Sequence, residues 1–203
     1  MLSVSQNELQ HLLRKALNAS GVEPGADDEL AKALADEASH GNGTTVLAAV
    51  TRQLTDAVNH GEQTLEIDAE RHRVITHGVS MLAIGAATAD AVCVLFEVYG
   101  AADVVIDDID RPALLLRILN NRRVRVAVDS ESSERPDSAA THRTIRLRHA
   151  ESQTRELPPE APQRTTLTPD VWSSLERLAA RTYVPDTERS RTQGAGANLD
   201  DSE

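Results

Sequence analysis

The stretch TLEIDAERHRVIT, residues 64–76, decides the fold class because the spacing of apolar residues changes there. Residues 64–68 and 72–76 alternate between apolar and polar side chains, a period of two that is typical of half-buried strands. Three residues, Ala-Glu-Arg at 69–71, separate the two alternating segments. The stretch therefore predicts a β-hairpin.

The residues before this hairpin predict a helical layer. Apolar residues recur there with helical spacing in three segments that glycine, proline and asparagine separate. Ser5 and Glu8 have the spacing of a capping box, in which each side chain bonds the other residue's backbone N–H. The predicted helices cover residues 5–18, 27–39 and 45–59.

The residues after the hairpin mix helices and strands. We expect a buried helix at 82–98, strands at 104–106, 123–128 and 144–148, a helix at 114–120 opened by Pro112, and a last helix capped by Thr168. This order predicts a single α+β domain over residues 1–185, with a small mixed sheet and packed helices. Its expected parts are a helical layer at 1–61, a sheet-containing part at 62–150 and a C-terminal helix at 168–182. A Gly-rich tail or binding loop follows at 186–203.

Composition excludes several classes of partner. The formal net charge is −11 and aromatic residues make up 2% of the chain, so neither a phosphate backbone nor stacked bases is an expected partner. The most apolar stretch, residues 81–99, contains Asp90 and Glu97, which favours a core helix over a membrane span. The first residues lack a basic region followed by an apolar run. We expect a cytoplasmic protein that binds neither nucleic acid nor membrane.

The segment RTYVPDTERSRTQGAGANLDD, residues 181–201, has the least generic composition. Its arginines could supply bidentate forks for an anion, and its glycines let successive backbone N–H groups turn toward one point. This combination predicts a binding loop for a small carboxylate or phosphate, although a disordered C-terminus has a similar composition. The candidate ligand-binding residues are Arg181, Tyr183, Thr187, Glu188, Ser190, Arg191, Gly194 and Gly196.

The same segment resembles the ending of the bacterial family known as domain of unknown function 3726, whose members end in RTYVP.SE.SR..GAGAG..D. The chain departs from this pattern at Thr187, which keeps a hydroxyl, and at Asn198, where glycine is usual. Residues 4–34 also resemble the first two helices of the family. The resemblance implies that the C-terminal segment is more than a disordered end, but it implies no particular activity.

A second resemblance concerns Ser39-His40-Gly41, which follows the second predicted helix. It is similar to the start of the malate and L-lactate dehydrogenase family that lacks a Rossmann fold, where this tripeptide belongs to the active site. No Asn-His-x-Gly follows in the present chain, so we expect no nicotinamide cofactor or other cofactor. Two alternatives stay open: a small metabolic enzyme that pairs His40 with Tyr183 or Glu188 for acid–base chemistry, and a non-catalytic subunit that binds a protein partner or a second copy of itself.

The remaining reactive residues are expected to be structural. Asp107, Asp108 and Asp110 follow a predicted strand and could bind Mg²⁺ or Ca²⁺, but a turn and helix-start cluster is the favoured interpretation. The single cysteine, Cys93, is expected to be a small buried apolar residue. The spacing of the remaining histidines brings none of them together, so we expect no metal site.

Overall fold

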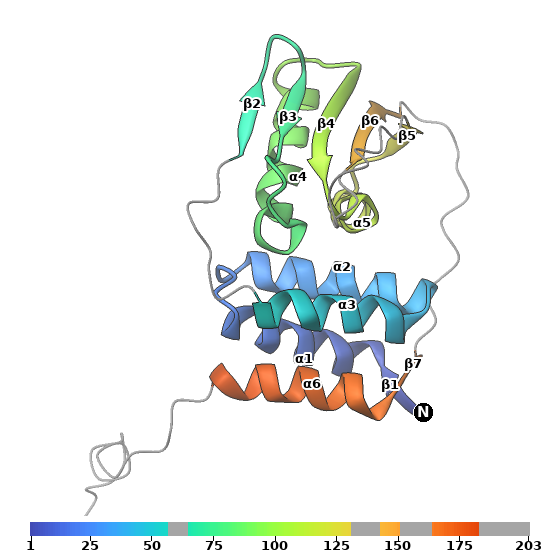
Figure 1. Cartoon of the computed structure of the whole chain (residues 1–203). Coiled ribbons are helices and arrows are strands. Elements are labelled where there is room, and N and C mark those ends of the chain that lie inside the picture. The colour runs from blue at the N-terminus through green and yellow to red at the C-terminus, as the bar shows by residue number, and fades with distance from the viewer. Residues whose placement is uncertain (57–64, 131–142, 151–163, 183–203) are drawn as a thin grey trace, which may run out of the picture.

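The computed structural model describes residues 1–56, 65–130, 143–150 and 164–182. Figure 1 shows a layer of helices below, a five-stranded sheet above, and two further helices, α4 and α5, between them. The predicted α+β class is confirmed.

The helical layer combines the start of the chain with its last helix. At α1, the Ser5 Oγ accepts a hydrogen bond from the Glu8 N–H, and the Glu8 carboxylate accepts one from the Ser5 N–H at 2.8 Å, so the predicted capping box is confirmed. The last helix, α6, packs against α1 and α3 and so belongs to this layer. The elements of the layer are α1 (Gln6–Ala19), α2 (Ala26–His40), α3 (Gly43–Asp56), α6 (Pro169–Ala179) and the 3-10 helix η1 (Ala180–Thr182).

A two-stranded ribbon, absent from the sequence prediction, closes one end of the helical layer. Strand β1 (Leu2–Ser5) pairs antiparallel with β7 (Arg164–Leu167). The first residue of α3, Gly43, lies so close to this ribbon that a Cβ there would be 2.6 Å from Thr165 Cγ2. The ribbon therefore holds the N-terminus, the start of α3 and the start of α6 together.

The five-stranded sheet is mixed, as predicted. Its strands are β2 (Glu66–Asp68), β3 (Arg73–Ile75), β4 (Asp103–Ile109), β5 (Val126–Ser130) and β6 (Arg143–His149). Their spatial order is β2-β3-β4-β6-β5, with β3 and β4 parallel and the other neighbours antiparallel. The hairpin predicted at 64–76 is confirmed as the β2–β3 pair.

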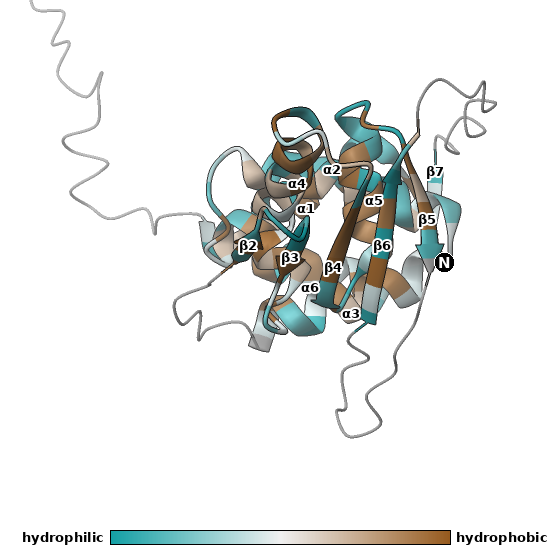
Figure 2. Ribbon diagram, turned by 90° about the horizontal axis from the view of Figure 1, so that it is seen from above, coloured by the Kyte–Doolittle hydropathy of each residue, from teal (hydrophilic) through white to brown (hydrophobic). Residues whose placement is uncertain are grey.

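The core lies between the sheet and the helical layer. Helices α4 (Met81–Glu97) and α5 (Pro112–Asn121) pack against the sheet on one side and α2 on the other. Val104, Ile106 and Leu147 are fully buried on the covered face of the sheet, and Figure 2 shows the apolar colouring of β4 and α4. The predicted buried helix at 82–98 is thus confirmed. Among the described residues, no helix is long and apolar enough to cross a membrane.

Candidate functional site

Of the predicted anion-binding segment, the structure describes the first two residues, Arg181 and Thr182. Arg181 lies in η1 with its side chain exposed, and it makes no hydrogen bond or ion pair with any residue that the structure describes. The other candidates lie outside the described residues: Tyr183, Thr187, Glu188, Ser190, Arg191, Gly194 and Gly196. Arg181 is therefore a cation available to an external anion.

Arg181 lies at the end of the helical layer where α1 turns into α2. Helix η1 packs against α1, and both α1 and α6 run toward this end in Figure 1. The turn between α1 and α2 contains two glycines and a proline: Gly21, Pro24 and Gly25. The positive φ of Gly25, 98°, suits a residue without a Cβ.

His40 lies at the opposite end of the same layer. It is the last residue of α2, and its Nδ1 lies 2.9 Å from the Asp36 carbonyl oxygen and 3.3 Å from an Asp36 carboxylate oxygen. Arg117 of α5 bonds the same carboxylate, so His40 belongs to a polar link between α2 and α5. The helix η1, which follows α6 and packs against α1, belongs to the other end of the layer, where α6 ends (Figure 1). Tyr183 and Glu188, the predicted acid–base partners of His40, lie outside the described residues, so this pairing stays a prediction.

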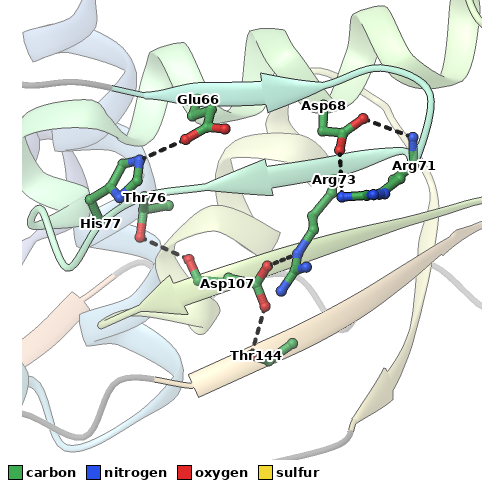
Figure 3. A network of polar contacts seen from close by, with 8 residues as sticks. All are labelled: Glu66, Asp68, Arg71, Arg73, Thr76, His77, Asp107 and Thr144. Carbon is green, nitrogen blue, oxygen red and sulfur yellow. Dashed lines mark hydrogen bonds and ion pairs between the residues drawn. The ribbon is translucent and has the colours of Figure 1, made fainter.

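Asp107 lies on the open face of the sheet and is fully engaged by its neighbours (Figure 3). Its carboxylate accepts hydrogen bonds from Arg73 Nε and, at 2.9 Å, from the Thr144 hydroxyl. The fully buried Thr76 hydroxyl donates to the carbonyl oxygens of Asp107 and Asp108. These bonds hold a bulge in β4, where Asp108 has a φ of 58°. The strand thus extends beyond its predicted end at residue 106, and the two aspartates lie within it instead of in a turn.

Asp110 has a structural role different from the predicted one. It was expected beside the start of the helix that Pro112 opens, but it accepts a hydrogen bond from the Met81 N–H at the start of α4. Ser80 and Gln53 also donate to its carboxylate. Asp110 does bond the start of a helix, as predicted, but the helix is α4 and not α5. Among the described residues, no group of three His, Cys, Asp or Glu side chains could hold a metal ion.

A groove of about 780 Å³ opens between the α1–α2 turn and α4. At its wall Arg122 bonds both oxygens of Glu29, one at 2.7 Å, and also bonds Asp90. Hydrogen bonding to Glu29 raises the pKa of Arg122, so this guanidinium stays charged. The groove is lined by Gly21, Val22, Glu23, Pro24, Gly25, Ala26, Glu29, Leu65, Ala83, Ile84, Ala86, Ala87, Asp90 and Arg122.

No sequence pattern predicts this groove. Glu29, Asp90 and Arg122 come from three different helices or helix ends, and no local motif links them. The one available signal was Asp90, an acid within an otherwise apolar helix. Cys93, one turn further along α4, is half-buried, and burial raises the pKa of its thiol despite a hydrogen bond from Arg122.

Comparisons of the chain with models of protein families, with curated proteins and with solved structures found no match.

Proposed function

We propose that this chain binds a small anionic ligand, a carboxylate or a phosphate, through residues 181–196. One observation carries the proposal: Arg181 is an exposed guanidinium without a partner among the described residues. Arg117 and Arg122, by contrast, are each bonded to carboxylates. Arg52, Arg123, Arg125 and Arg143 are likewise exposed and without a side-chain partner among the described residues. Arg181 differs from them because it begins the segment that contains Arg191, Ser190 and the glycines.

The sequence of the segment supports the same chemistry. Arg181 and Arg191 can each present two parallel N–H groups to a carboxylate or phosphate. Thr187 and Ser190 add hydroxyl donors, and the backbone around Gly194 adds N–H groups. From the resemblance of this segment we also propose membership of the bacterial family domain of unknown function 3726. From the composition of the chain we propose a cytoplasmic location.

Isothermal titration calorimetry with inorganic phosphate and with succinate tests the proposal. We expect saturable binding of at least one of them, weakened about tenfold or more in Arg181→Ala and in Arg191→Ala because each loses a charge-assisted pair. Arg125→Ala is the matched control, since Arg125 is also exposed but lies beside the sheet. An equal loss of anion affinity in all three variants, or no binding of either anion, would contradict the proposal.

A second candidate, a protein that works as a subunit, is favoured by an exposed apolar surface at the end of α4. Val94, Val98 and Tyr99 are 42%, 72% and 56% exposed. Apolar residues gathered in this way are typical of protein contacts. Sedimentation equilibrium tests self-association: a dimer in the wild type that becomes a monomer in Val98→Ser/Tyr99→Ser would support this candidate, and a wild-type monomer that co-purifies with no stoichiometric partner would contradict it.

A further inference from the structure

We infer that the groove between the α1–α2 turn and α4 binds the primary ammonium group of a small aliphatic amine. This inference is separate from the proposed anion site, because it rests on other residues. The volume of about 780 Å³ lies in the usual range for small-molecule sites.

The charge of the groove is negative. Three of its lining residues, Glu23, Glu29 and Asp90, are carboxylates, and only Arg122 is basic. Arg122 cannot recruit an anion, since its Nε, Nη1 and Nη2 atoms all donate to Glu29 or Asp90. A cationic ligand is therefore complementary to the groove, and an anionic one is not.

Acceptors remain available after Arg122 is satisfied. One Asp90 oxygen bonds Arg122, while the Asp90 side chain is 69% exposed and its other oxygen has no partner among the described residues. The exposed Glu23 carboxylate likewise has no partner in the described part of the chain. An ammonium group has three donors and no acceptor, so it matches acceptors of this kind.

The apolar part of the groove lining suits a ligand with a short aliphatic chain. Ala83, Ala86 and Ala87 present small apolar side chains from α4, and Val22 and Leu65 add apolar surface. None of the described residues that line the groove is aromatic, so it offers no cation–π contact for a quaternary ammonium. The geometry therefore favours a primary amine on a methylene chain.

Titration with 1,4-diaminobutane, followed by amide chemical shifts of the whole chain, tests this inference. We expect saturable shifts at Gly21–Ala26 and Ala83–Asp90, and none with 1,4-butanediol, which has the same length but no charge. Asp90→Asn and Glu23→Gln should each weaken binding about fivefold. Asp170→Asn removes the same charge from an exposed site on α6 and should change binding less than twofold.

Three results would overturn the inference: no saturation by the diamine, equal shifts with the diol, or wild-type affinity in both groove variants. Glu23→Gln neutralises a carboxylate that has no partner among the described residues, so it keeps the test valid if Asp90→Asn loosens the fold. Neither variant touches Arg181. A failed diamine titration with intact phosphate or succinate binding would thus reject the amine site alone, and the reverse result would reject the anion site alone.

Discussion

Asp110, which follows β4, accepts a hydrogen bond from the backbone N–H of Met81, the first residue of α4, at 2.9 Å. The first N–H groups of a helix have no partner within the helix, and a carboxylate there also interacts favourably with the helix dipole. The bond joins residues 29 positions apart, so it fixes the start of α4 against the end of the central strand.

Asp110→Ala should therefore destabilise the protein by about 1–2 kcal/mol, as loss of a helix cap usually does. Urea unfolding followed by circular dichroism measures the change. Asp103→Ala is the control, because Asp103 is partly exposed and its nearest arginine nitrogen is 3.8 Å away. A similar loss of stability in both variants would show that the hydrogen bond to Met81 does not account for the effect of Asp110→Ala.

Glu37 is a partly buried acid in α2, near the interface with α5. Its Oε2 is buried without a hydrogen-bond partner, and burial raises the pKa of its carboxyl, while Arg111 and Arg117 act in the opposite direction. The folded state therefore holds this proton to a higher pH than the unfolded state does. This contribution to stability is complete below the ordinary glutamate pKa and is lost as the pH rises through the raised one.

Glu37→Gln should be about as stable as the wild type at pH 4 and increasingly more stable than it as the pH rises toward 7. Unfolding free energies measured from pH 4 to pH 7 test this expectation. Glu97→Gln, a change at an exposed position of α4, should show no such growing difference. If the Glu37 variant loses stability relative to the wild type as the pH rises, the sign of the pKa shift is wrong.

Gly43, the first residue of α3, lies close to β7. A Cβ added there would lie 2.6 Å from Thr165 Cγ2 and 3.1 Å from the Ala38 carbonyl oxygen. Gly43→Ala should cost about 1–3 kcal/mol through overpacking. In Gly41→Ala the nearest atom is 3.4 Å away, so thermal unfolding should show a much smaller change. Equal melting temperatures for the two variants would contradict the tight fit.

Cys93 should react slowly with thiol reagents. Burial raises the pKa of its thiol, and the thiolate is the reactive form. The rate of reaction with iodoacetamide at pH 7 should be well below that of free cysteine and should rise on unfolding in urea. A rate equal to that of free cysteine would show that the side chain is more accessible than its half-buried position indicates.

Most of the fold could be predicted because local patterns determine it. The capping box at Ser5, the alternation at 64–76 and the proline that opens α5 each specify an element without distant contacts. The β1–β7 ribbon could not be predicted in this way, since Leu2 pairs with Leu167 across nearly the whole chain. The end of β4 was missed because its stabilising partners, Arg73 and Thr144, come from neighbouring strands.

The candidate sites likewise depend on contacts that local sequence patterns do not predict. The composition of residues 181–196 drew attention to Arg181, and the structure leaves that side chain exposed. The groove, however, depends on a Glu29–Arg122–Asp90 network in which residues from α2 and α4 meet the residue after α5. No sequence spacing predicts that these three side chains lie together, because their proximity results from the packing of α4 and α5 against α2.

The most direct test of the proposed function is to map the anion on the protein. Amide chemical shifts of the full chain, recorded during titration with inorganic phosphate and with succinate, show which residues respond. The proposal predicts saturable shifts concentrated in residues 181–196, which disappear in Arg181→Ala/Arg191→Ala and persist in Arg125→Ala. Shifts confined to other parts of the chain, or no saturable shifts with either anion, would contradict it.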